Sequence, residues 1–324
     1  MTLLSPDEFQ RRIYHGLIPA VPVPFTAAGE IDAVAQERYV AYMAQQPVVG
    51  VAVWAHTGRG LRLTREQRVK VLQSWVRALG AAKLVVAGVG GSPTHMADFS
   101  AYMNSALEMA RNALEDGAQA FLVHPPRLFH HVAENQALIL DYHRQLASLG
   151  APLILFYLYE AAGGIAYTPE VLRQLFAMPQ VAGIKLATLD SVMTFQTVAN
   201  LLAREFPSKL VITGEDRFLG YSLMCGAQAA LIGMGAACCG LQREMMLAYF
   251  EGRAAEFLEL SRAVDRLSQV TFIPPMEGYI RRMLWALVHL RVIGRESTHD
   301  PWGPELPEGE FLELGNTLRA LGEL

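Results

Sequence analysis

Short apolar runs alternate with longer amphipathic stretches from residue 17 to about residue 250, and this alternation restricts the fold more than any other feature of the sequence. The runs are nearly continuous in hydrophobic residues, which is typical of parallel strands buried on both faces. The eight expected strands are Leu17–Phe25, Val49–Ala55, Leu84–Val89, Ala120–His124, Leu153–Leu158, Val181–Leu186, Leu210–Gly214 and Ala229–Met234. Eight strand–helix units predict a closed (β/α)₈ TIM barrel, whose active site lies at the carboxyl ends of the strands.

The stretches between the strands have the spacing of surface helices, for example Arg65–Leu79. Thr64 just before this stretch and Gln67 three residues later have the spacing of a capping box. A doubly wound open sheet is the competing architecture, but the Gly-x-Gly-x-x-Gly turn that often follows its first strand is absent. Beyond residue 250 the strand pattern stops and helical patterns follow. We therefore predict a barrel over residues 1–250 and a C-terminal helical extension over residues 251–324, packed on the barrel.

Charge and apolar patterning argue against two classes of partner. A net charge of −4 gives no basic surface for nucleic acid, and no apolar run reaches the roughly 18 residues of a membrane span. The first residues lack the pattern of a secretory signal peptide. The three cysteines, Cys225, Cys238 and Cys239, are too few and too clustered for a disulfide framework. These features predict a cytoplasmic enzyme that binds neither nucleic acid nor membrane.

Lysine is rare in this chain, which has four lysines and twenty-three arginines. Lys70 falls in an expected surface helix, and Lys83 and Lys209 each precede an expected strand, at the amino end of the barrel. Lys185 instead lies near the carboxyl end of the expected strand Val181–Leu186, on the catalytic side. Burial lowers the pKa of an ammonium, and a neutral amine can attack a ketone to form an imine. A structural ion pair is the alternative role for Lys185.

Two further segments bring reactive groups to the same end of the barrel. Tyr157 closes the expected strand Leu153–Leu158, and its phenol could shuttle the proton that imine formation requires; simple packing of its ring is the alternative. The loop after the second strand contains His56, Thr57 and Gly58. Its hydroxyl and backbone N–H groups make it a candidate carboxylate-binding loop, and His56 is either a general acid or base, or a polar loop residue.

Together these segments resemble the dihydrodipicolinate synthase / N-acetylneuraminate lyase family of class I aldolases, almost from end to end. The segments that carry the resemblance are Gly16–Phe25, His56-Thr57-Gly58 with Leu63-Thr64 and Arg68, Gly183-Ile184-Lys185, and Gly214-Glu215-Asp216. The resemblance implies a Schiff base at Lys185 and binding of the substrate carboxylate by Thr57. We expect no cofactor and no metal, because the sequence has no recognisable ligand set for a metal-dependent aldolase, and the adjacent His130 and His131 lack a third ligand.

The family's catalytic tyrosine has two candidate positions in this chain. Counting forward from Pro152 gives Phe156, whereas counting back from Pro169 or from Lys185 gives Tyr157. The second count uses two anchors and needs one extra residue in the strand. We therefore expect Tyr157 to be the proton relay of the resemblance.

Other positions depart from the family pattern. Arg59 stands where the family has a loop acid, and His56 where it has its first loop threonine. The stretch His124–Arg127 lacks the tyrosine pair of the synthase branch, and Ala161–Gly163 lacks its arginine. These departures argue against true dihydrodipicolinate synthase activity. Arg59, Arg127 and His56 could form a pocket for a further anionic or polyhydroxylated group, with loop solvation or ion pairing between subunits as the alternative.

We therefore expect a class I lyase, an aldolase or a dehydratase, that acts on pyruvate, a related 2-oxo acid or a 2-keto-3-deoxy sugar acid. The resemblance also implies a homo-oligomer, a homotetramer or a homodimer. The alternative from another class is a catalytically inactive barrel that binds a metabolite as a sensor or a structural partner, because a fold does not guarantee an activity. The presence of both Lys185 and Tyr157 argues against that alternative.

Overall fold

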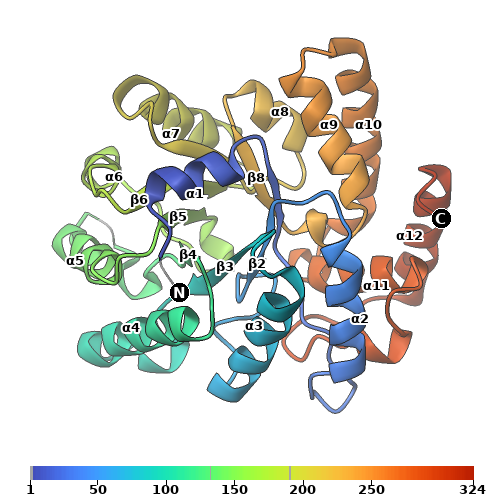
Figure 1. The fold of residues 1–324 in the computed structure, drawn as a ribbon, viewed down its shortest axis with the longest axis horizontal. Helices are drawn as coiled ribbons and strands as arrows, with labels where there is room; N and C mark the ends of the chain where they lie inside the picture. Colours follow the sequence, from blue (N-terminus) through green and yellow to red (C-terminus); the bar gives the residue numbers. More distant parts are fainter. Residues whose placement is uncertain (1–2, 132, 190) are drawn as a thin grey trace.

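The computed structural model describes residues 3–131, 133–189 and 191–324, and it has eight parallel strands in the order β1-β8-β7-β6-β5-β4-β3-β2 (Figure 1). Backbone hydrogen bonds from Val49 to Leu17 and from Val21 to Ala52 close the sheet between β1 and β2. The strands are β1 (Leu17–Pro19), β2 (Gly50–Val53), β3 (Leu84–Val89), β4 (Ala120–Val123), β5 (Leu153–Leu158), β6 (Val181–Ala187), β7 (Leu210–Thr213) and β8 (Ala229–Ile232). The predicted (β/α)₈ barrel is confirmed.

Helices surround the barrel, as Figure 1 shows. The α-helices are α1 (Pro6–Ile13), α2 (Ala33–Ala44), α3 (Arg65–Leu79), α4 (Phe99–Glu115), α5 (Gln136–Ala147), α6 (Pro169–Phe176), α7 (Val192–Glu205), α8 (Leu219–Met224), α9 (Cys239–Phe250), α10 (Ala254–Thr271), α11 (Tyr279–His289) and α12 (Glu308–Ala320). The 3₁₀ helices are η1 (Pro93–His95), η2 (Arg127–Phe129), η3 (Glu160–Ala162), η4 (Met234–Ala236), η5 (Met276–Gly278) and η6 (Arg295–Ser297). The predicted capping box is present at α3, where Thr64 and Gln67 satisfy each other's backbone N–H groups. In the described part of the chain, no helix is long and apolar enough to cross a membrane.

Helix α1 is an element that the sequence analysis does not anticipate. Ser5 caps it and Pro6 occupies its first turn. Phe9 and Ile13 are fully buried with the residues of the barrel interior, and the amide of Gln10 donates to the backbone carbonyls of Ala182 and Ser208, each at 2.7 Å. Because these carbonyls lie at the amino ends of β6 and β7, α1 covers the end of the barrel opposite the catalytic face.

The C-terminal helices pack on the side of the barrel, where α10 lies against α8 and α9, and α12 lies against α10 and α11. A second connection reaches the loops that follow the strands. Phe25, after β1, forms an isolated bridge with His299, and Ser297 donates to the carboxylate of Asp32 at 2.7 Å. These contacts hold the segment around η6 near the carboxyl ends of the strands. The division of the chain at residue 250 into two domains stays a prediction.

Candidate active site

Lys185 lies inside the barrel in the second half of β6. It pairs in register with Phe156 on β5 and Ile212 on β7, its side chain is buried, and its Nζ lies 4.4 Å from the centre of the Phe156 ring. Gly214 leaves the space for it, since a Cβ there would come within 2.6 Å of Lys185 Cε. Lys83, in contrast, is at the amino end of the barrel, where its Nζ donates to the carbonyls of nearby residues.

Opposing effects act on the pKa of Lys185. Burial is the largest and lowers the pKa below its usual range, while the carboxylates of Asp216 and Glu215 oppose that decrease. Burial also raises the pKa of Asp216, against hydrogen bonds that include one from the Met234 N–H at 2.6 Å, and it raises the pKa of Glu215 to about 7. The amine of Lys185 is therefore neutral more readily than the amine of a solvent-exposed lysine.

A small cavity of about 40 Å³ surrounds Lys185, and we call it the inner cavity. Its lining includes Thr57, Phe156, Lys185, Gly214, Asp216 and Tyr279. The wall thus combines an amine, two hydroxyl groups, a carboxyl group and two aromatic rings. Such a cavity suits a small polar molecule with one apolar side.

Tyr157 lies on the opposite side of β5 from Lys185, so the structure corrects its predicted role as proton relay. Successive side chains of a strand point to opposite faces, and here Phe156 points inward while the Tyr157 ring packs against Tyr167, with ring centres 5.7 Å apart. Tyr157 does not line the inner cavity. The forward count from Pro152 is therefore the correct one, and the residue opposite Lys185 has no hydroxyl group.

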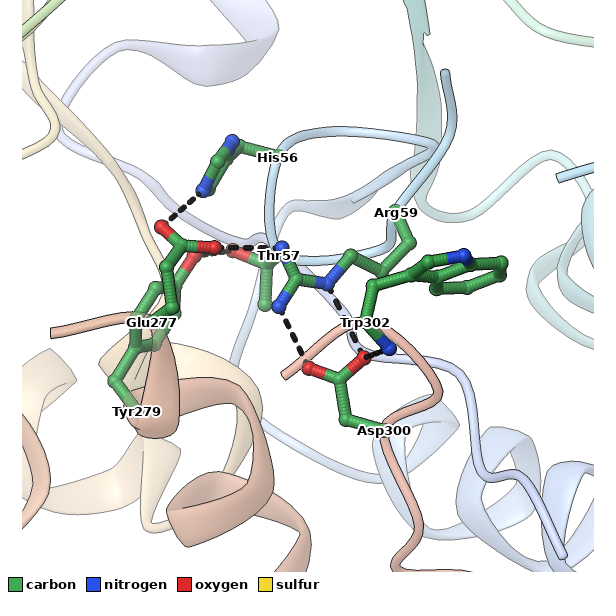
Figure 2. A network of polar contacts seen from close by, with 7 residues as sticks. All are labelled: His56, Thr57, Arg59, Glu277, Tyr279, Asp300 and Trp302. Atoms are coloured by element: carbon green, nitrogen blue, oxygen red, sulfur yellow. Dashed lines mark hydrogen bonds and ion pairs between the residues drawn. The ribbon is translucent and has the colours of Figure 1, made fainter. Parts of the chain in front are cut away.

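The loop after β2 and the C-terminal segment form one polar network (Figure 2). Thr57 is buried, and its Oγ1 lies 2.9 Å from the hydroxyl oxygen of Tyr279, at the start of α11. The Nε2 of His56 lies 2.8 Å from Oε1 of Glu277, in η5. Two predicted site residues, His56 and Thr57, thereby reach the inner cavity together with Lys185.

Arg59 belongs to the same network, and its guanidinium is bound by protein carboxylates. Its Nη1 donates to Glu277 at 2.6 Å, and its Nε and Nη2 donate to the two oxygens of Asp300 at 3.3 and 2.7 Å. Arg59 also lines a cavity at this end of the barrel, and its predicted role in substrate binding stays a prediction. Burial would raise the pKa of Glu277, but the hydrogen bonds and charges of His56 and Arg59 outweigh it and lower that pKa to about 2.

Gly58 shapes the loop. Its N–H donates to the carbonyl of Ala55 at 3.0 Å, so that group is engaged in a turn, which corrects its prediction as part of a carboxylate cradle. A Cβ at Gly58 would come within 2.9 Å of the Val21 carbonyl oxygen. A glycine is therefore required for the loop to lie this close to the chain after β1.

A second, larger cavity of about 570 Å³ opens beside the first, and we call it the outer cavity. Its lining includes Arg62, His124, Arg127, Gly163, Glu277 and Trp302. Arg127 thus lines this cavity, and its side chain packs next to Gly163. Its predicted role in substrate binding stays a prediction. Among the described residues, only His56 and Leu158 line both cavities, so the two cavities meet there.

Three residues of the site that are not among the predicted ones come from the C-terminal segment: Glu277, Tyr279 and Asp300. The pair His56 and Glu277 is 221 residues apart in the chain, and no local pattern links such distant positions. The closest signal is the proline pair Pro274-Pro275 just before Glu277, which marks a break between helices. Within the described residues, no three or more His, Cys, Asp or Glu side chains are grouped so that they could hold a metal ion.

Comparison with known proteins shows which family the chain is related to. The sequence profile of the dihydrodipicolinate synthetase family matches residues 13–319. The chain belongs to this family. One member, the 4-hydroxy-tetrahydrodipicolinate synthase of Stenotrophomonas maltophilia (strain K279a), is 30% identical over 221 residues, 68% of each chain. The N-acetylneuraminate lyase of Rattus norvegicus is 29% identical over 250 residues, 75% of this chain and 73% of that one.

The fold of this family member also matches solved structures. YagE, a prophage protein of the dihydrodipicolinic acid synthase family from E. coli K12, solved in complex with pyruvate, superposes with a TM-score of 0.79. The match covers 95% of this chain and 98% of that one, at 22% identity. At that identity the likeness concerns the fold alone.

Proposed function

We propose that this chain is a class I lyase in which Lys185 forms an imine with pyruvate or a related 2-oxo acid. The observation that carries the proposal is the buried amine of Lys185, which lies inside the barrel at its catalytic end, against Phe156 and Gly214. Burial lowers the pKa of this amine, and a neutral amine is the form that attacks a ketone. Membership of a family with lyases among its members supports the same reaction class.

The chemistry follows from the imine. The Lys185 nitrogen adds to C2 of the oxo acid and a water molecule leaves, which gives a protonated imine. That cation withdraws electrons from C2, so that either the C3–C4 bond can break or a C3 proton can be removed, with an enamine as the shared product. Aldol cleavage and dehydration are the two reactions that such an enamine supports.

The hydroxyl pair of Thr57 and Tyr279 supports binding of the substrate carboxylate. Both residues line the inner cavity, and burial raises the pKa of Tyr279 well above its usual range, so its phenol stays protonated. A protonated phenol and an alcohol can donate hydrogen bonds to a carboxylate. We assign the carboxylate and the C2 carbonyl of the substrate to the inner cavity on these grounds.

The outer cavity indicates which oxo acids to test. It is more than ten times as large as the inner cavity, and Arg62 and Arg127 are among the residues that line it. Space and positive charge favour a substrate whose remainder is polyhydroxylated or anionic, such as a 2-keto-3-deoxy sugar acid. Ala161, Ala162 and Gly163 line this cavity where the synthase branch carries an arginine, which agrees with an activity other than dihydrodipicolinate synthesis.

A screen of substrates tests this function. The protein is incubated with pyruvate and a series of aldehydes, and separately with 2-keto-3-deoxy sugar acids, and products are followed by NMR. We expect turnover that favours anionic or polyhydroxylated substrates over neutral apolar ones and that Lys185→Ala abolishes. Product formation that continues unchanged in Lys185→Ala would contradict the imine mechanism.

A further inference from the structure

The residue opposite Lys185 is Phe156, which has no proton to exchange, so another group must move protons beside the imine. The described residues that line both cavities are His56 and Leu158, and only His56 can titrate. If the carbonyl carbon C2 of the substrate is bound to Lys185 in the inner cavity, the chain from C3 onward passes His56 as it enters the outer cavity. The bonds that form and break at C3 and C4 therefore lie beside this imidazole.

We propose that His56, oriented by Glu277, is the general acid–base residue of this site and moves the protons at C3 and at the C4 hydroxyl group. The inference rests on the proposed imine at Lys185. It assigns to the loop after β2 and to the C-terminal segment a task that a strand-β5 phenol would otherwise perform.

The contacts of Glu277 prepare the imidazole for this role. A carboxylate accepts hydrogen bonds only, so the Nε2 of His56, at 2.8 Å from Oε1, carries the proton of this contact. Nδ1 is then the nitrogen that can receive a proton from the substrate. Glu277 is itself fixed by Arg59, which two bonds to Asp300 hold in place. A carboxylate bound to an imidazole in this way fixes its tautomer and stabilises the imidazolium that forms on protonation.

Several other charged or titratable groups lie around His56. Arg59 is on the same loop as His56. The other elements contribute His124 after β4, Lys185 on β6, Glu215 and Asp216 after β7, and Tyr279 at the start of α11. Burial lowers the pKa of His124 to about 4, and its Nε2 contacts the Trp54 carbonyl at 3.0 Å, so it stays neutral. Glu277, in contrast, contacts His56 directly, and its replacement is the most direct way to change the acid–base behaviour.

The proton steps balance for aldol cleavage. Nδ1 of His56 takes the proton of the C4 hydroxyl group, the C3–C4 bond breaks, and its electron pair forms the C2=C3 bond as the electrons of the C=N bond move to nitrogen. The aldehyde leaves. The imidazolium returns the proton to C3, the imine reforms, and water releases pyruvate from Lys185. With pyruvate alone, repeated removal and return of a C3 proton by His56 exchanges the methyl hydrogens with solvent.

That exchange gives a test that needs no identified aldehyde. Pyruvate is incubated with the full-length protein in D₂O, and loss of the methyl signal is followed by ¹H NMR, while borohydride trapping on Lys185 measures the imine in parallel. For His56→Gln we expect an exchange rate lower by about 10²- to 10⁴-fold with a trapped adduct still formed.

Glu277→Gln is the second variant, and it keeps an acceptor oxygen while losing the charge. We expect the exchange rate to fall by about 10- to 100-fold, and the acidic limb of its pH profile to move to lower pH, because the imidazolium loses its anionic neighbour. Glu305→Gln is the matched control. Glu305 is a largely exposed residue of the same segment that pairs with Arg281, and the profile of this variant should match the wild type.

The outcomes separate the two proposals. An imine that forms in His56→Gln with an unchanged exchange rate would overturn the role of His56, and so would an unshifted profile in Glu277→Gln. A wild-type protein that forms the imine but exchanges no methyl hydrogen would also overturn it. A wild-type protein that forms no imine with pyruvate would contradict the proposed function itself.

Discussion

At the scale of single residues, the reactivity of Lys185 depends on what surrounds its amine. The ring of Phe156 lies 4.4 Å from Nζ and offers a cation–π contact in place of water. Burial lowers the pKa of the amine, and Asp216 is the largest effect in the opposite direction. The balance between these two effects sets the pH at which the neutral amine becomes available.

Asp216→Asn tests that balance. The asparagine oxygen can still accept the hydrogen bond from Met234 N–H, now 2.6 Å from Asp216 Oδ1, but the negative charge that raises the pKa of Lys185 is gone. The pKa of Lys185 then falls further, so we expect the rate of imine formation with pyruvate to reach half its maximum at a lower pH than in the wild type. Cyanoborohydride trapping at a series of pH values measures this midpoint, and a midpoint that moves to higher pH would refute the role of Asp216.

Sequence spacing alone assigns Tyr157, and not Phe156, to the position beside Lys185, and the structure shows that this assignment is wrong. A shift of one residue moves a strand side chain to the other face, and two sequence anchors, Pro169 and Lys185, both favour Tyr157. Spacing along the chain does not distinguish an extra residue in the strand from one in the following loop. The register of Phe156 with Lys185 does distinguish them, because it depends on which residues lie side by side in space.

At the scale of elements, the sequence predicts best where a pattern is local. The expected bounds of β3, β5 and α3 agree with the structure residue for residue, because apolar runs and capping residues define them. Helix α1 and the place of Glu277 in the site are missed, since no local pattern marks either of them. Their positions depend on contacts with residues far away in the chain, such as Ala182 for Gln10 and His56 for Glu277.

The contact between β6 and the end of β7 leaves no room for a side chain at Gly214. In Gly214→Ala the new Cβ would lie 2.6 Å from Lys185 Cε and 2.9 Å from the Leu186 carbonyl oxygen. We expect the free energy of unfolding to fall by about 1–3 kcal/mol, and Lys185 to be displaced so that imine trapping decreases. Gly240→Ala in α9 is the control, because a Cβ there meets no atom within 4 Å. Equal trapping in both variants would disprove the steric argument.

Arg282 in α11 fixes the turn that leads to Glu277. Its fully buried guanidinium pairs with Glu310 at 2.8 Å and donates to the carbonyls of Ile273 and Pro275 at 2.8 and 3.3 Å. Removing one partner of a buried pair leaves the other charge uncompensated, so we expect Arg282→Met to lower the free energy of unfolding by about 3–5 kcal/mol. Urea denaturation measures this loss.

A surface arginine provides a control for that measurement. Arg77 in α3 pairs with Glu37 at 3.2 Å, and their side chains are 65% and 61% exposed, so Arg77→Met should cost less than about 1 kcal/mol. A similar loss of stability in the two variants would mean that the buried network around Arg282 does not hold the turn.

At the scale of the whole molecule, the C-terminal segment completes the catalytic end of the barrel. Buried residues of α11, such as Trp285 and Leu287, belong to the same hydrophobic cluster as the helices around the barrel, and Glu277 and Tyr279 reach the loop after β2. The candidate site thus combines residues of the loop after β2, of β6 and of the C-terminal segment. The predicted alternation of strands and helices explains the barrel, and the three-dimensional contacts explain the site.

Assembly is a further property at this scale. We propose that the chain forms a homodimer or a homotetramer, in keeping with the family resemblance and with exposed apolar side chains such as Met193, Met224 and Leu258. Sedimentation equilibrium should give two or four times the mass of one chain, 35.7 kDa. A mass of a single chain at micromolar concentration would contradict this proposal.

The central claim is that Lys185 is the residue that binds the oxo acid covalently. The most direct measurement is borohydride reduction in the presence of pyruvate, followed by intact mass and peptide mapping, with Lys185→Arg as the control. We predict one reduced pyruvyl adduct per chain, located on Lys185, and none in the variant. A well-folded protein that yields no adduct with pyruvate or with larger 2-oxo acids, or an adduct that maps to another lysine, would contradict the claim.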